Sequence, residues 1–189
     1  MKKNLGSVLA LYPTPLVIIG VMNANKPTWM LAGHIGIIGH DRIMISMHKI
    51  HYTNQFIKET KHLSVALVDE ELLPQADYVG MVSGKKVDKS NIFDYILSKN
   101  NIPVITDSPL VMECEVVDNY ETETFDNFIC RILNTCAEEK VVDENNKINY
   151  AELKPILFEM PTYSYLKTGE LLGQGTSFGK DWQEKKNGE

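Results

Sequence analysis

The sequence predicts a mainly β protein, built as a closed or partly open antiparallel barrel with short helices beside it. Six or more segments carry strand patterns, and the helical segments between them lack the regular strand–helix alternation of a doubly wound sheet. Residues 16–22 (LVIIGVM) are almost continuously apolar, which is typical of a strand buried on both faces. Residues 42–48 (RIMISMH) alternate strictly, which is typical of a strand with one face on a core.

The first half of the chain predicts a hairpin followed by a third strand. A turn cluster at residues 23–27 separates the apolar run from a second strand at 28–33, so the two strands should pair. In residues 42–48 the isoleucines and Met47 face one side, while Arg42, Ser46 and His48 share the other. A cation, a hydroxyl and an imidazole therefore lie together on one strand face.

Three helices are expected in the middle of the chain. Residues 52–60 form the first if Thr53 is its N-cap, and residues 74–82 form the second, with proline in the first turn. The strongest helical pattern covers residues 90–99. Ser90 is the expected cap of this third helix, and one apolar stripe contains Ile92, Phe93, Ile96 and Leu97.

The remaining strands are expected mainly in the second half. Residues 62–69 form a strand between the first two helices, and residues 110–117 alternate apolar with acidic side chains. Residues 125–136 form a long strand, and residues 162–166 are a last possible one.

Length and charge limit the function classes. A chain of 189 residues has room for one large domain, and 19 basic against 25 acidic residues give a net charge of −6. This charge argues against binding to nucleic acid, which requires many cations, but not against one small anionic ligand. The apolar run at residues 15–22 is too short to span a bilayer, and three cysteines suit neither a disulfide framework nor a zinc site. We therefore expect a cytoplasmic protein.

Several chemistries lack their motifs. The chain has no GxGxxG, and residues 80–86 (GMVSGKK) do not have the spacing of a phosphate-binding P-loop. His48 and His51 are three residues apart across a strand end with no carboxylate at ligand spacing, so no metal site is predicted.

Three segments carry positive signals, each with a simpler alternative. Residues 46–53 (SMHKIHYT) lead into a helix start, where His48, Lys49 and Thr53 could hold an anion. In the simpler alternative, Thr53 only caps the helix and the cations only keep the surface soluble. Residues 83–89 (SGKKVDK) hold three lysines suited to a phosphate, or form a solvated turn. Residues 163–169 (YSYLKTG) could cover a flat ring or a neighbouring subunit, or could be a core rim with a loose end.

The order and spacing of several segments resemble the flavin reductase-like family of FMN-binding split barrels, and its flavoredoxin-like members in particular. The most specific pieces are YPTP near the N-terminus, YT before a short helix, and SG followed by DK. The resemblance covers nearly the whole chain, through LYPTPLVIIG at 11–20, KPTWMLAGHIGII at 26–38, ISMHKIHYTNQFI at 45–57, VSGKKVDKSNIF at 82–93, PLVMECEVV at 109–117 and YSYLKTGELLG at 163–173.

The resemblance implies a six-stranded antiparallel Greek-key split barrel with short peripheral helices. It implies one domain over residues 1–180, a solvated tail at 181–189, and a homodimer that holds FMN near the subunit interface. Residues of this chain that match the family's cofactor contacts are Thr28, Met30, Leu31, Ala32, Gly33, His34, Ser46, Met47, His48, Lys49, Thr53 and Lys89.

The chain departs from the family pattern at five of these positions. In the segment 28–34, where the family pattern reads N-x-M-T-x-S-W, this chain has Thr28 for asparagine, Leu31 for threonine, Gly33 for serine and His34 for tryptophan. The family's usual arginine near position 48 is replaced by His48. Leu31 cannot donate a hydrogen bond, and a histidine is only partly charged at neutral pH. We expect FMN to bind more weakly, in a shifted position, or not at all.

The function implied is that of an FMN-binding oxidoreductase. Electrons from a reduced nicotinamide or a protein donor would pass through bound FMN to a small-molecule or protein acceptor, and no catalytic side chain is assigned. Two alternatives remain. One is an electron carrier without enzymatic turnover that docks a protein partner. The other is a binding module that has lost its flavin or accepts another planar ligand such as haem, with His34, His48 or His51 as axial ligand.

Overall fold

The main sheet of the protein is seven-stranded and antiparallel throughout. The computed structural model describes residues 1–180 and residue 182, so nearly all of the tail predicted at residues 181–189 lies outside the described residues. The strands of this sheet, in spatial order, are β3 (Lys26–Ala32), β2 (Val17–Asn23), β6 (His62–Leu67), β9 (Leu110–Glu121), β10 (Phe125–Ala137), β5 (Arg42–His48) and β4 (Ile35–Ile37).

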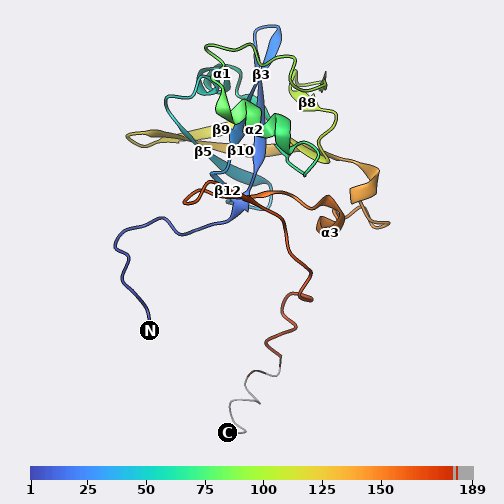
Figure 1. The fold of residues 1–189 in the computed structure, drawn as a ribbon. Helices are drawn as coiled ribbons and strands as arrows, with labels where there is room; N and C mark the ends of the chain where they lie inside the picture. The colour runs from blue at the N-terminus through green and yellow to red at the C-terminus, as the bar shows by residue number, and fades with distance from the viewer. Residues whose placement is uncertain (181, 183–189) are drawn as a thin grey trace.

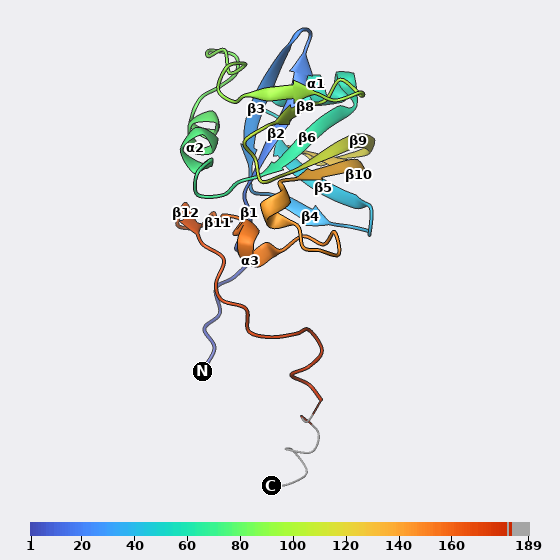
Figure 2. The ribbon, with the colours of Figure 1, turned by 90° about the vertical axis from the view of Figure 1, so that its right-hand side faces the viewer.

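The two edges of this sheet are consecutive parts of one chain segment. Only Gly33 and His34 separate β3 from β4, and the Ser46 backbone N–H donates to the His34 carbonyl at 2.9 Å. Six chain segments therefore surround the core in the order β2, β3–β4, β5, β10, β9, β6, which is a Greek-key order, and the curl of the sheet is seen in Figure 2. The mainly β antiparallel barrel is confirmed, but the main sheet has seven strands and not the expected six, because a break at Gly33 and His34 separates β4 from β3.

Smaller elements lie around the barrel. A three-stranded sheet contains β1 (Thr14–Pro15), β11 (Leu157–Glu159) and β12 (Ser164–Leu166). A separate hairpin pairs β7 (Tyr95–Leu97) with β8 (Pro103–Ile105). The helices are α1 (Thr53–Thr60), α2 (Leu73–Met81), α3 (Tyr150–Leu153) and the 3-10 turn η1 (Glu139–Val141). None of the helices in the described part of the chain is long and apolar enough to span a bilayer.

Strand β2 separates two hydrophobic clusters, as its continuous apolar run predicts. Val17, Ile19 and Val21 belong to the cluster inside the barrel, whereas Ile18 packs with Trp29 in a second cluster on the outer face. Helix α2 contributes to the outer cluster and covers that face of β3 (Figure 1). The alternation of β5 is also confirmed, because its odd-numbered residues from 43 to 47 are buried.

The helix predicted at residues 90–99 does not form. The Ser90 backbone N–H donates to the Asp88 carboxylate at 2.9 Å, and the chain then turns into strand β7. Phe93 and Tyr95 both pack edge-on against Trp29, at ring distances of 5.4 and 5.9 Å, while Ile96 is 61% exposed. The apolar stripe is therefore coincidental, because packing on the indole orients these side chains.

Thr53 is not the N-cap of α1, contrary to prediction. Tyr52 takes that position without a side-chain capping bond, and Thr53 is the first helical residue, 4% exposed. The second helix lies close to the predicted residues, with Pro74 in its first turn. Strand β9 continues to Glu121, and the predicted C-terminal strand is the shorter β12.

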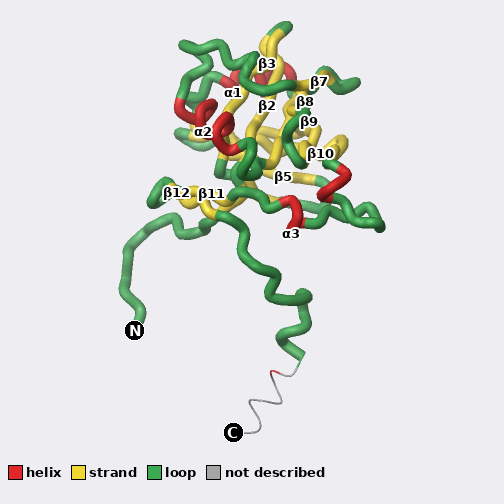
Figure 3. Tube along the Cα trace, turned by 45° about the vertical axis from the view of Figure 1, so that its right-hand side comes forward, coloured by secondary structure: helices red, strands yellow, loops and turns green. Residues whose placement is uncertain are grey.

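Both terminal segments extend away from the barrel. Residues 1–11 and 167–180 follow separate irregular paths on the same side of the molecule (Figure 3). Large apolar side chains there are exposed, including Leu9, Leu11, Leu171, Leu172 and Phe178.

Candidate functional site

Three adjoining cavities form one trough along β3 and the loops beside it. The histidine cavity, of about 280 Å³, is lined by Met30, Ala32, Gly33, His34, Ser46, Met47, His48, Ile50, His51, Phe125, Phe158 and Met160. The middle cavity, of about 240 Å³, is lined by Met30, Ile50, His51, Tyr52, Thr53, Val79, Gly80, Met81, Val82, Ser83, Gly84 and Lys89. The lysine cavity, of about 300 Å³, is lined by Asn23, Lys26, Pro27, Thr28, Tyr52, Gly84, Lys85, Lys86, Val87, Asp88 and Lys89.

Shared lining residues make the trough continuous. Met30, Ile50 and His51 line both the histidine cavity and the middle cavity. Tyr52, Gly84 and Lys89 line both the middle cavity and the lysine cavity. A ligand with an apolar end and an anionic end could therefore extend from one cavity into the next.

The histidine cavity presents ring faces and hydrogen-bonding groups. The His34 Nε2 atom lies 2.7 Å from the Tyr12 hydroxyl, which ties the YPTP segment to the end of β3. Phe125, at the start of β10, lies 5.3 Å from the His48 ring and 6.1 Å from the His34 ring, measured between centroids. This combination suits a flat, partly polar ring system.

Lys89 is a buried cation at the junction of the middle and lysine cavities. Its side chain is 6% exposed, and Nζ donates to the carbonyls of Trp29 at 3.2 Å and Val79 at 2.6 Å. No carboxylate among the described residues pairs with it, and burial lowers its pKa to about 8. A buried ammonium held only by carbonyl oxygens has capacity left for an anionic ligand.

His51 lines the middle cavity in surroundings that favour its neutral form. Burial lowers its pKa, and the nearby positive charges of His48 and Lys89 lower it further. No aspartate or glutamate lines the histidine or middle cavity. Because Lys89 is a buried cation there without an acidic neighbour in either cavity, the trough favours an anion over a cation.

Two glycines in the trough walls allow the backbone to lie close against neighbouring side chains. A Cβ at Gly84 would lie 2.7 Å from a Tyr52 ring carbon and 3.3 Å from the Thr28 hydroxyl oxygen. A Cβ at Gly33 would lie 2.7 Å from the Phe158 ring. Larger residues would therefore narrow the trough or displace the rings that line it.

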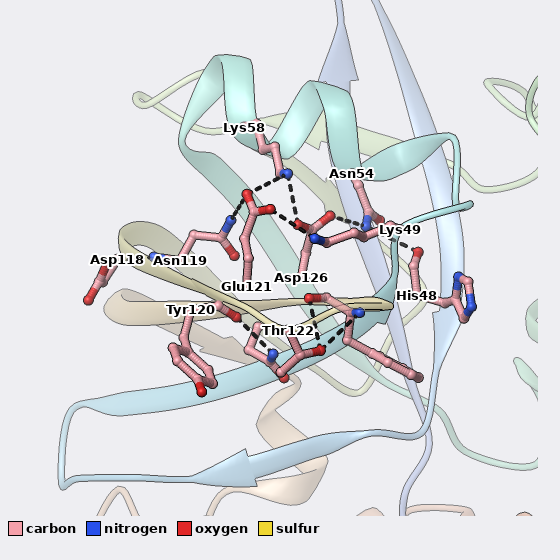
Figure 4. Close-up of polar contacts among 12 residues, drawn as sticks. His48, Lys49, Asn54, Lys58, Asp118, Asn119, Tyr120, Glu121, Thr122 and Asp126 are labelled. Carbon is pink, nitrogen blue, oxygen red and sulfur yellow. Dashed lines mark hydrogen bonds and ion pairs between the residues drawn. The ribbon is translucent and has the colours of Figure 1, made fainter.

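Of the twelve residues predicted for the cofactor, ten line the trough and Leu31 and Lys49 do not. Leu31 lies on the opposite face of β3, where it contacts Gly80 and lines a fourth cavity of about 260 Å³. The Lys49 ammonium instead forms an ion pair with Glu121 at 3.0 Å, directed toward the β9–β10 hairpin (Figure 4).

A polar network supports the turn that carries His48. The Asn54 amide donates to the His48 carbonyl at 3.2 Å and to Asp126 at 2.7 Å, and Lys58 pairs with Asp126 at 2.7 Å (Figure 4). Burial alone would raise the pKa of Asp126, but hydrogen bonds from Lys58 and Asn54 hold it below its usual value. The network joins α1, β10 and the end of β5, and so fixes one wall of the trough.

Sequence reasoning did not assign several lining residues to the cofactor site. His51 and Tyr52 lie inside a segment already singled out, so proximity to Thr53 could have included them. Phe125, Phe158 and Met160 come from distant parts of the chain. The barrel brings Phe125 to the trough through β10, whereas Phe158 arrives through the pairing of β11 with β1. Among the described residues, no group of three or more His, Cys, Asp or Glu could hold a metal ion.

Comparisons with known proteins agree with this fold. The flavin reductase like domain matches residues 9–159. A protein of Archaeoglobus fulgidus is 31% identical over 153 residues, covering 74% of this chain and 81% of that protein. The structure is similar to flavoredoxin from Methanosarcina acetivorans, with a TM-score of 0.90 and 28% identity over 96% of this chain and 99% of that one. The structure is also similar to flavoredoxin of Desulfovibrio vulgaris (Miyazaki F), with a TM-score of 0.87 and 26% identity over 95% of this chain and 100% of that one. The chain belongs to the flavin reductase-like family.

Proposed function

We propose that the protein is an FMN-binding oxidoreductase that passes electrons from a reduced nicotinamide to a small-molecule or protein acceptor. The observation that carries this proposal is Lys89, at the junction of the middle and lysine cavities of a trough lined by ring faces. It is a buried ammonium that has no carboxylate partner among the described residues. A flavin mononucleotide has the matching order of groups, with a flat ring, a polyol chain and a terminal phosphate.

The histidine and middle cavities suit successive parts of that cofactor. The ring would lie in the histidine cavity between residues of β3 and β5, near His34 and His48. The polyol would follow Met30 through the middle cavity, and the phosphate would meet Lys89 with the Thr53 hydroxyl nearby. The substitutions that distinguish this chain from the family pattern fall at both ends of this path, so weaker binding than usual is part of the proposal.

The chain's own contribution is binding, orientation and exclusion of water. When bound, the flavin supplies the redox chemistry, accepting a hydride equivalent and passing electrons onward. Phe125 and Phe158 reduce the access of water to the histidine cavity, and Tyr12 holds the His34 ring in one orientation. No side chain needs to act as general acid or base for hydride transfer, so none is assigned that role.

We further propose that the working unit is a homodimer with the cofactor near the interface. An apolar cavity of about 630 Å³ lies beside β4, lined in part by Ile35, Ile37, Met112 and Tyr150. Ile37 is 86% exposed at the edge of that cavity. Such a surface favours association with a second copy. Light scattering after size exclusion tests this, and a monomer at all concentrations up to tens of micromolar would contradict it.

The proposed compartment is the cytoplasm. All three cysteines are free thiols, two of them buried, and burial raises the pKa of the Cys130 thiol to about 12. Unreactive buried thiols are compatible with a reducing environment.

The decisive experiment is the visible spectrum of the purified protein before and after addition of FMN. A flavin spectrum or saturable uptake of FMN supports the proposal, and rapid bleaching by NADH or NADPH supports the enzyme over a carrier without turnover. Bound flavin that neither nucleotide reduces would favour the electron carrier. No flavin uptake, or a Soret band in its place, would refute the proposed cofactor.

A further inference from the structure

We propose that the fourth cavity, on the outer face of β3, binds a small organic cation that carries an alkylated ammonium group. This tyrosine cavity encloses about 260 Å³, and its lining includes Asp77, Phe158, Tyr163 and Tyr165. Asp77 and the two tyrosines line none of the three cavities of the trough. The inference goes beyond the proposed function and does not require a bound flavin.

Three aromatic rings surround this cavity. The Phe158 ring lies 5.7 Å from the Tyr163 ring at an interplanar angle of 85°, and 5.7 Å from the Tyr165 ring at 43°. Phe158 and Tyr165 are direct partners in the β11–β12 pair, so their side chains lie on the same face of that hairpin. Several inclined rings around one space attract a cation, because the faces of aromatic rings carry negative potential.

A carboxylate from α2 adds a negative charge to the rings. The Tyr165 hydroxyl donates to Asp77 Oδ1 at 2.5 Å. Burial raises the pKa of Tyr165, and the bond to Asp77 raises it further, so the hydroxyl stays protonated and Asp77 keeps its charge. No lysine, arginine or histidine among the described residues pairs with Asp77, and Lys167, close to Tyr165 in sequence, is paired with Glu70 at 2.7 Å. The carboxylate is therefore available to a cationic ligand.

Tyr163 has an unfavourable backbone conformation for its side chain. Its φ of 56° lies in the left-handed region, which glycine and asparagine adopt more readily than an aromatic residue. Its backbone N–H donates to the Met160 carbonyl at 3.2 Å, which fixes the turn between β11 and β12. Tyr163 is nevertheless 76% exposed, so burial of the ring does not offset this cost. A tyrosine held in this way is better explained by binding than by folding.

The remaining lining decides the class of cation. A metal ion requires several oxygen ligands, whereas this cavity offers one carboxylate. An alkylated ammonium is weakly hydrated, and its methyl groups would contact the apolar side chains of Leu16, Leu31 and Met81. The cavity is smaller than typical pockets for drug-sized ligands, which suits a compact cationic group.

The test compares choline with neohexanol, its neutral isostere with carbon in place of nitrogen, in NMR titrations of the full-length protein. We expect choline to bind at least about tenfold more tightly than neohexanol. Tyr163→Leu removes the exposed ring, and Asp77→Asn removes the charge but keeps an acceptor for Tyr165. Each should lower the affinity for choline by about 3- to 30-fold. The controls are Tyr120→Leu and Asp118→Asn at the exposed end of β9, which should change it by less than about twofold.

Four outcomes would overturn the inference. Choline that does not bind at tens of millimolar would remove the site, and equal binding of neohexanol would show an apolar cavity only. Unchanged affinity in both cavity variants would place choline elsewhere, and equal losses in the β9 controls would show a general effect. Should Asp77→Asn fail to fold, Tyr163→Leu decides alone, because its ring is mostly exposed. A protein that binds choline in this way but takes up no FMN would retain this inference and refute the proposed function.

Discussion

Replacing Lys89 with methionine should separate recognition of the phosphate from recognition of the flavin ring. The substitution keeps most of the side-chain volume and removes the buried ammonium, which donates to two backbone carbonyls. A charged hydrogen bond to phosphate in a buried position contributes up to about 3 kcal/mol, so the affinity for FMN should fall about 100-fold. Riboflavin has the same ring and no phosphate, and its affinity should stay within about threefold of the wild-type value.

The same substitution should change the stability of the flavin-free protein only slightly. Burial lowers the pKa of Lys89 from 10.5 to about 8, so keeping the group charged at neutral pH costs about 3 kcal/mol. Methionine removes that cost but leaves two carbonyls without their donor, which costs about 1–3 kcal/mol each. The opposing contributions should leave the free energy of unfolding within about 2 kcal/mol of the wild type.

Fluorescence titration of FMN and riboflavin against the wild type, Lys89→Met and Lys89→Arg tests this reasoning. Arginine keeps the charge and should restore part of the FMN affinity, whereas Lys99→Met controls for loss of a remote surface charge. Equal losses for FMN and riboflavin would show that Lys89 supports the ring site and not the phosphate. Unchanged FMN affinity would remove the phosphate assignment.

Three more predictions concern pH, packing and the polar network. The affinity for FMN should fall as pH rises above about 8, by up to about tenfold per pH unit, because Lys89 must then take up a proton to bind phosphate. Titration of FMN at pH 7 to 10 measures this fall, and the Lys89→Arg variant should not show it. Gly20→Ala should lower the free energy of unfolding by about 1–3 kcal/mol, because its Cβ would overlap the buried indole ring of Trp29. Gly36→Ala is the control, since a Cβ there meets nothing within 4 Å and should change the free energy of unfolding little. Urea denaturation compares the two variants. Asp126→Ala should cost about 1–3 kcal/mol at pH 7, because it removes a buried carboxylate that accepts from the Asn54 amide and pairs with the partly exposed Lys58. Since the pKa of Asp126 is lowered in the folded protein, its contribution to stability is present above the usual aspartate pKa and is lost as pH falls through the lower folded value. Measured from pH 2 to 7, the free energies of unfolding of the variant and the wild type should therefore converge toward acid pH. Parallel curves would contradict this assignment.

The barrel could be predicted from sequence because each strand carries its own signal. The apolar run in β2 and the alternation in β5 depend on burial of neighbouring faces, which short-range patterns record directly. The helix expected at residues 90–99 failed because its spacing arose by chance, and contacts with Trp29 decided the outcome. Strand β4 has three residues and continues β3 after a break, so no local pattern marks it.

The candidate site divides in the same way. The residues of β5, the turn after it and the loop at residues 83–89 lie in segments with an evident chemical character, whereas those of β3 were predicted only from the resemblance to the family. The burial of Lys89 could not be foreseen, since a run of three lysines in seven residues is usually a solvated turn. The second wall, formed by Phe125 and Phe158, depends on contacts between residues far apart in the chain.

The interruption at Gly33 and His34 has a consequence for the dynamics of the barrel. Strand β4 pairs through only three residues with β5, whereas β10 pairs along most of its 13 residues with β9. The short ladder should therefore open by local unfolding at much lower free energy than the long hairpin, and its amide hydrogens should exchange with solvent first. Because His34 and Gly33 line the trough, a ligand seated there would bridge the interruption and slow that exchange. Hydrogen exchange in residues 33–37, with and without ligand, would thus report occupancy of the trough from the backbone alone.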